Sequence, residues 1–155
     1  MNITIPIDCE DGHQFLLKLT DCRNLPIEPG IEIVDIALID ASSVVGINNA
    51  GTLNRISLIL LNFLEENDVV LYFYCAKDPI RIRTRKEGVS YQQYRSRLFC
   101  SMYDRVTNSH AGRFINKSIV LRDSTYGDHY IHLISKVEYS EVIESLEGHL
   151  SNFNK

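Results

Sequence analysis

Val69-Val70-Leu71-Tyr72-Phe73-Tyr74-Cys75-Ala76 is an unbroken run of apolar and aromatic residues. Its length suits a β-strand and is far too short to span a bilayer. A strand that is apolar at every position, rather than at every second one, is covered on both of its faces. The run therefore predicts the central strand of a sheet.

Helical patterns lie on either side of this run. The segment from Leu53 to Glu66 repeats its apolar residues at helical spacing, and Thr52 precedes it as the expected N-cap. The segment from Tyr91 to Asn108 does the same behind Ser90, and a last helix is expected from Ser140 onward.

The rest of the chain has the patterns of strands and turns. We expect strands at Asn2–Ile7, His13–Thr20, Ile31–Asp40, Ile80–Arg85, Ser118–Asp123 and His129–Lys136, with hairpin turns at 10–12 and 125–128. The predicted order is β-β-β-α-β-(β)-α-β-β-α. This order indicates one α+β domain over residues 1–155, with an antiparallel or mixed sheet of five to seven strands packed by three helices.

Composition narrows the class of protein. Hydrophobic residues make up 45% of the chain, which is enough for a core, and the first residues lack the pattern of a signal peptide. We expect a cytoplasmic protein that does not enter a membrane. The four cysteines are not spaced as metal ligands, so we expect buried, reduced thiols, with neither a metal nor a cofactor.

A local motif resembles a small bacterial family of uncharacterised function. The family has an aromatic strand that ends in Tyr-Cys and an acid, followed by an Arg-x-Arg-x-Phe helix with an aromatic residue one turn later. The matching residues here are Cys75, Asp78, Arg95, Arg97, Phe99 and Tyr103, and the match covers about a quarter of the chain. The segment 79–88 is longer and more basic than in the family. Because the family brings no known activity, the resemblance implies a shared fold at most.

The distribution of charge is more informative than its total of −4. Between Lys77 and Arg122 there are eight arginines and three lysines against three acidic residues, a balance of +8. The rest of the chain has a balance of −12. Arginine is well suited to bind phosphate or carboxylate in a bidentate manner.

Three arginines are expected to share one face of a strand. Arg81, Arg83 and Arg85 alternate with apolar residues, so their side chains would project together about 7 Å apart. The helix that follows would add a favourable N-terminus for an anion, together with Tyr91 and one of Arg95 and Arg97. In the alternative interpretation these charges protect a sheet edge, or the acidic remainder of the chain neutralises them.

The histidines suggest a weaker, catalytic alternative. His129 and His132 lie three apart in a strand and should face opposite sides, so they cannot share a metal ion. His132 is expected to be a hydrogen-bonded surface residue. His110 or His132 could act with the arginines in a small nuclease or another phosphate-transforming enzyme.

Three functional hypotheses remain open. The first is a non-enzymatic binding or regulatory module, whose basic face of Arg81, Arg83, Arg85, Tyr91 and Arg95 engages an acidic protein surface or single-stranded nucleic acid. The second is the nuclease. The third is a structural protein that self-associates through its acidic and basic surfaces.

Overall fold

The fold is described from a computed structural model over residues 2–8, 14–22, 31–40, 50–75, 89–108 and 112–153, without the side chains of residues 39–40, 50–53 and 152–153. The strands are β1 (Asn2–Asp8), β2 (Gln14–Asp21), β3 (Glu32–Asp40), β4 (Val69–Tyr74), β5 (Phe114–Leu121) and β6 (His129–Lys136). The helices are α1 (Ala50–Glu66), α2 (Tyr91–Thr107) and α3 (Ser140–Phe153), with a short 3-10 turn η2 (Val137–Tyr139) before α3. The predicted α+β class and element order are confirmed.

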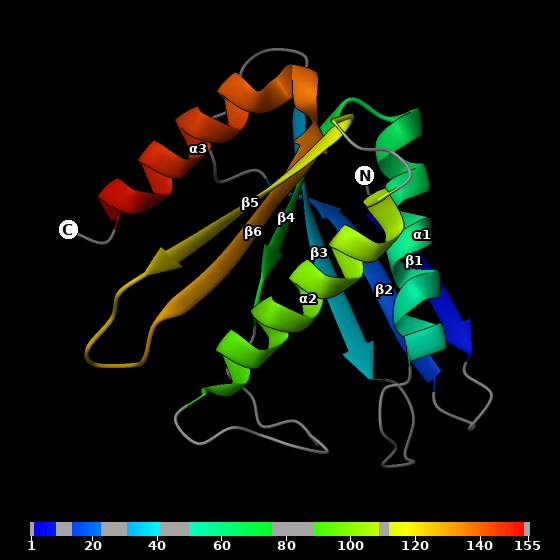
Figure 1. Cartoon of the computed structure of the whole chain (residues 1–155), viewed down its shortest axis with the longest axis horizontal. Coiled ribbons are helices and arrows are strands. Elements are labelled where there is room, and N and C mark those ends of the chain that lie inside the picture. Colours follow the sequence, from blue (N-terminus) through cyan, green and yellow to red (C-terminus); the bar gives the residue numbers. More distant parts are fainter. Residues whose placement is uncertain are drawn as a thin grey trace.

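The six strands form one mixed sheet in the order β1-β2-β3-β4-β6-β5 (Figure 1). Only β3 and β4 run parallel, and α1 connects them; all the other neighbouring strands are antiparallel. Strand β6 lies between β4 and β5, so the connection from β4 through α2 to β5 passes over it.

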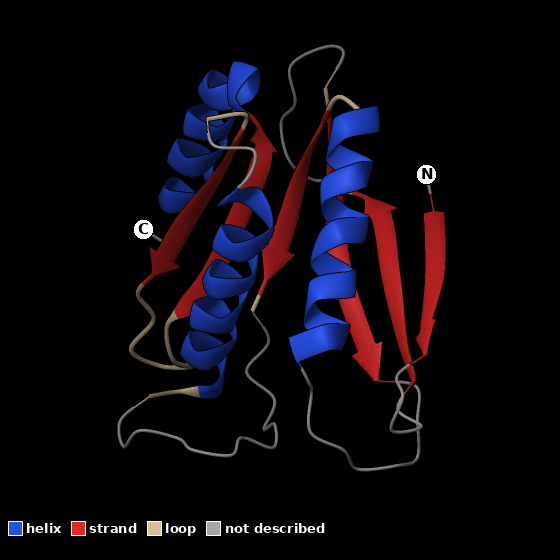
Figure 2. Cartoon of the chain, turned by 45° about the vertical axis from the view of Figure 1, so that its right-hand side comes forward, coloured by secondary structure: helices blue, strands red, loops and turns tan. Residues whose placement is uncertain are grey.

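The sheet has helices on both faces, as the apolar run in β4 predicts (Figure 2). One core lies between the sheet and the pair α1 and α2, and Leu71 and Phe73 of β4 belong to it. A second core lies between the sheet and α3, where Val70, Tyr72 and Tyr74 face. Successive residues of β4 thus enter opposite cores, which explains why the strand has no polar position.

Several boundaries differ from the predictions. Helix α1 begins at Ala50, so Thr52 lies inside the helix and is not its N-cap. Strand β5 begins at Phe114, four residues earlier than expected, because its polar residues Asn116 and Lys117 pair with β6. Ser90 is confirmed as the N-cap of α2, since its hydroxyl accepts a hydrogen bond from the backbone N–H of Gln93 at 3.2 Å. The predicted strand Ile80–Arg85 lies outside the described residues.

Within the described ranges, no helix combines the length and the apolar character needed to cross a membrane.

Candidate functional site

The structure describes only part of the predicted binding face. Arg81, Arg83 and Arg85 lie outside the described residues, as does His110. Tyr91 and Arg95 lie in the first two turns of α2, and both are partly buried.

Arg95 lies near the end of β4. Burial raises the pKa of the Cys75 thiol to about 12, and the Arg95 guanidinium opposes this rise through its positive charge. Arg97, two residues further along α2, is exposed, as expected for positions that diverge on a helix. Arg95 and the carboxyl end of β4 therefore belong to one region, and Arg97 points away from the sheet.

The same region includes the turn between β5 and β6. The backbone N–H of Cys75 donates to the Tyr130 carbonyl at 2.9 Å, and Gln92 of α2 donates through Nε2 to the Asp128 carbonyl at 3.1 Å. The end of β4 and the start of α2 thus both contact the beginning of β6. We call this region the β4–α2 end; it comprises Tyr74–Cys75, Val89–Arg95 and Arg122–His129.

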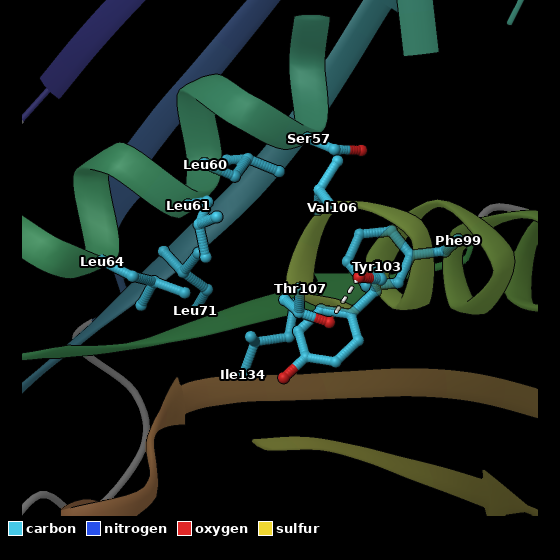
Figure 3. A pocket seen from close by; sticks show the side chains of 10 residues that line it. All are labelled: Ser57, Leu60, Leu61, Leu64, Leu71, Phe99, Tyr103, Val106, Thr107 and Ile134. Atoms are coloured by element: carbon cyan, nitrogen blue, oxygen red, sulfur yellow. Dashed lines mark hydrogen bonds between the residues drawn. The ribbon is translucent and has the colours of Figure 1, made fainter. Parts of the chain in front are cut away.

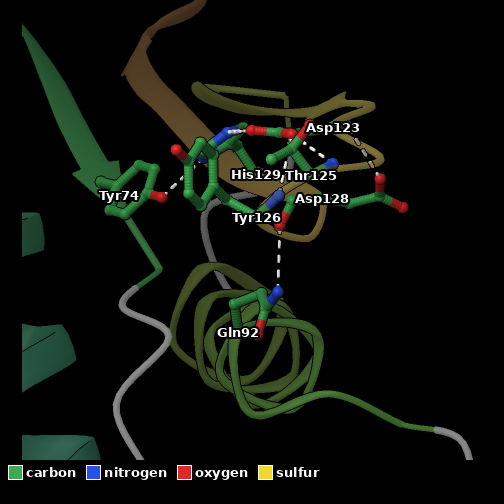
Figure 4. A network of polar contacts seen from close by, with 7 residues as sticks. All are labelled: Tyr74, Gln92, Asp123, Thr125, Tyr126, Asp128 and His129. Carbon is green, nitrogen blue, oxygen red and sulfur yellow. Dashed lines mark hydrogen bonds and ion pairs between the residues drawn. The ribbon is translucent and has the colours of Figure 1, made fainter.

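Asp123 organises the turn within the β4–α2 end (Figure 4). Its Oδ1 accepts the backbone N–H groups of Thr125 and Tyr126 at 2.9 and 3.0 Å, and its Oδ2 lies 2.9 Å from His129 Nε2. These hydrogen bonds, with that from Tyr126 the largest contribution, lower the pKa of Asp123 to about 2. Gly127 closes the turn with a φ of 89°, a conformation that favours glycine.

His129 ties this turn to β4. Because the ionised carboxylate of Asp123 can only accept, His129 Nε2 carries the proton that is shared with it. When the ring is neutral, Nδ1 is the acceptor and takes the hydrogen bond from the Tyr74 hydroxyl, 2.7 Å away. Burial, followed by nearby Cys75 and Asp123, raises the pKa of Tyr74 and keeps this donor protonated.

His132 is buried, contrary to the expectation of a surface residue. It faces α2, where Ser96 Oγ lies 2.8 Å from Nε2, while Asn116 Oδ1 and Ser118 Oγ lie 3.0 and 3.2 Å from Nδ1. Phe73 and Phe99 pack near the ring. Burial lowers the pKa of His132 to about 4, so the ring is neutral at physiological pH.

These contacts limit the chemistry open to the two histidines. His129 and His132 face opposite sides of the sheet, as predicted, and both ring nitrogens of each are engaged inside the protein. His132 has no exposed atom with which to reach a substrate. Across the described ranges, no group of three or more His, Cys, Asp or Glu residues could hold a metal ion.

The thiols follow the expectation only in part. Cys75 is fully buried, whereas Cys22 and Cys100 are partly exposed, and Cys9 lies outside the described residues.

Three basic residues of the segment from Lys77 to Arg122 already pair with acids elsewhere in the chain. Arg113 lies 3.6 Å from Glu65, Lys117 lies 3.3 Å from Glu147, and Arg122 lies 2.7 Å from Asp128. Among the described residues of this segment, internal neutralisation, the alternative to an external ligand, thus accounts for Arg113, Lys117 and Arg122.

An apolar groove lies between α1 and α2 (Figure 3). It is lined mainly by leucines together with Phe99, Val106 and Ile134, and Tyr103 lies among them. The Tyr103 hydroxyl is buried without a hydrogen-bond partner, and burial raises the pKa of Tyr103 to about 12. The space that the centre of a water molecule can occupy in this half-open groove is about 20 Å³, enough for a single water molecule.

Two residues of the β4–α2 end did not stand out in the sequence. Tyr126 is 77% exposed at the tip of the turn, and the Arg122 side chain at its base is 80% exposed. The sequence placed Tyr126 only in a turn. An aromatic residue in a predicted turn, where it has little to pack against, is the signal that could have identified it.

Comparisons of the chain with family models, curated proteins and solved structures find no match.

Proposed function

We propose that the protein is a non-enzymatic binding module that engages single-stranded nucleic acid at its β4–α2 end. The basic segment 76–88, which includes Arg81, Arg83 and Arg85, binds the phosphates together with Arg95. Tyr91 provides an aromatic surface beside them.

The observation that carries this proposal is where the basic segment is attached. Residues 76–88 contain five basic and two acidic residues and join Cys75 to Val89. Both of these residues belong to the β4–α2 end, where the Arg95 guanidinium also lies near Cys75. The ends of the basic segment, the N-terminus of α2 and a further arginine therefore converge on one part of the molecule. A helix N-terminus adds a favourable field for anions.

Two features favour nucleic acid over an acidic protein surface. The positive charges in segment 76–88 and at Arg95 are mainly arginines, which bind phosphates and stack on bases. Tyrosines accompany them at Tyr91 and Tyr126. The acidic remainder of the chain disfavours close approach of a double helix, and a flexible single strand can contact one end of the molecule alone.

Single-stranded oligonucleotide binding over a series of salt concentrations tests the proposal. The variant Arg81→Ala/Arg83→Ala/Arg85→Ala should bind at least tenfold more weakly, with a salt slope reduced by about 2 because about 0.7 is lost for each phosphate contact. Unchanged affinity in this variant would exclude the proposed site.

A charge-matched control removes three positive charges at the opposite end of the sheet. Arg105, Arg113 and Lys136 lie at the end of α2, before β5 and at the end of β6. The variant Arg105→Ala/Arg113→Ala/Lys136→Ala should bind nearly as the wild type does. An equal loss in both variants would mean that overall charge, and not a site, governs binding. If the protein binds an acidic polypeptide such as polyglutamate but no oligonucleotide, the partner is an acidic protein.

A further inference from the structure

The turn that carries Tyr126 lies at the surface, and a dense set of hydrogen bonds fixes its backbone. Besides the two hydrogen bonds to Asp123 Oδ1, the backbone N–H of Gly127 donates to the Asp123 carbonyl at 3.0 Å, and that of Asp123 donates to Asp128 Oδ1 at 3.1 Å. His129 and Gln92 fix the base of the turn to β4 and α2. The backbone of Tyr126 is therefore fixed before any partner arrives.

The side chain of Tyr126 is largely open to solvent. Its exposed fraction of 77% is well above those of the other exposed large hydrophobic residues in the described part of the chain, which lie between 37% and 49%. When the ring binds, only the side-chain torsions of Tyr126 remain to be ordered, because the cost of ordering the backbone has already been met in folding. The turn thus presents an aromatic ring on a backbone that is fixed in advance.

The charges around Tyr126 suit a base better than a phosphate. The carboxylates of Asp123 and Asp128 lie at the turn, but each accepts hydrogen bonds from groups of the turn itself. Their negative charge still disfavours a phosphate directly at Tyr126. An uncharged base avoids this repulsion, and its face can stack on a tyrosine ring.

We infer that Tyr126 is a base-stacking residue for single-stranded nucleic acid. Arg95 holds a phosphate of the strand, and an unpaired base lies on the Tyr126 ring. The Tyr74–His129–Asp123 set positions the turn and does not contact the ligand. This inference rests on the proposed function, since it requires that a single strand binds at the β4–α2 end.

The test compares two probes that differ only in their bases. A short oligothymidylate and an abasic oligomer of the same length carry the same phosphates. The wild type should bind oligothymidylate more tightly than the abasic strand. Tyr126→Ala should weaken oligothymidylate binding by about 5- to 150-fold, the contribution of one stacked base, and leave abasic binding unchanged.

Two variants control for the ring and for the turn. Tyr126→Phe keeps the ring and should retain wild-type binding of oligothymidylate. Thr125→Ala changes a neighbouring exposed side chain, keeps the backbone N–H that Asp123 binds, and should also bind normally. The amide NMR shifts of the turn should be conserved in Tyr126→Ala, because its hydrogen bonds use backbone groups.

The possible results separate this inference from the proposed function. If Tyr126→Ala keeps the preference for oligothymidylate, or if the wild type has no preference, the stacking role is wrong while phosphate binding at the arginines stands. If the wild type binds neither strand, both the stacking role and the proposed function are wrong.

Discussion

Ser96 Oγ lies 2.8 Å from His132 Nε2, and this buried contact joins α2 to β6. Asn116 Oδ1, on the other side of the ring, can only accept a hydrogen bond, so His132 Nδ1 carries the proton. The neutral imidazole therefore accepts from Ser96 and donates to β5. One side chain thus links a helix and two strands through polar contacts within an otherwise apolar layer.

This arrangement predicts a loss of stability in mild acid. The pKa of His132 is about 4 in the folded protein and about 6.5 in the unfolded chain. The unfolded state therefore binds the proton first as the pH falls. The stabilisation due to the neutral ring is fully present above pH 6.5 and is lost progressively down to pH 4. The loss in the free energy of unfolding amounts to at most about 3 kcal/mol, measured by urea denaturation.

His132→Leu removes the titrating ring and serves as the comparison. Between pH 6.5 and 4 the variant should lose less stability than the wild type, even though it is less stable at pH 7 because Ser96 and Asn116 lose their partner. Parallel curves for the two proteins would show that His132 does not titrate as its burial implies.

The His132 set also shows where sequence patterns stop being informative. The alternation of side chains along β6 correctly places His129 and His132 on opposite faces of the sheet. It does not show which of these faces is covered, or which elements cover it. The partners Ser96 and Asn116 lie 36 and 16 residues away in other elements, and no local signal connects them. A buried histidine with polar partners has the same local pattern as an exposed one.

Other features can be predicted from the sequence because they depend on residues that are neighbours along the chain. The apolar run of β4 and the serine cap of α2 depend on neighbouring residues, and both are confirmed. The insertion of β6 between β4 and β5 depends on pairing between distant strands. The predicted start of β5 is wrong because it also depends on such pairing. Asn116 and Lys117 are polar, and their pairing with β6 keeps them in a strand.

The central position of β4 predicts a large cost for truncating one of its core residues. Leu71 is fully buried in β4, whereas Leu58 of α1 is 49% exposed. Leu71→Ala should lower the free energy of unfolding by about 2–5 kcal/mol, and Leu58→Ala by less than about 1 kcal/mol. Urea denaturation of both variants measures the difference. Similar costs would contradict the assignment of β4 to the centre of the sheet.

The Asp123 carboxylate should control the dynamics of the turn. Asp123→Ala removes the acceptor of the Thr125 and Tyr126 amides and of His129. Hydrogen exchange at these two amides should then accelerate, because their protection comes from the carboxylate. In the wild type the protection of these two amides, relative to their intrinsic exchange rate at the same pH, should fall in the same way below about pH 3.8, as the pH approaches the lowered pKa of Asp123.

A substitution that leaves the turn intact provides the reference. Glu144→Ala removes an exposed carboxylate on α3 and should leave exchange at Thr125 and Tyr126 unchanged. Equal rates in Asp123→Ala and Glu144→Ala would mean that the carboxylate does not hold the turn.

Arg95 and Arg97 offer a matched pair for locating the nucleic-acid site. They are two residues apart on α2 and carry the same charge, but Arg95 lies near Cys75 and Arg97 is exposed and directed elsewhere. Arg95→Ala should reduce the slope of log affinity against log salt by about 0.7, the value for one phosphate contact on a single strand. Arg97→Ala should leave the slope nearly unchanged. Fluorescence anisotropy with oligothymidylate at several salt concentrations measures both slopes. A larger effect at Arg97 would move the site to the outer face of α2, because net charge is identical in the two variants and only position distinguishes them.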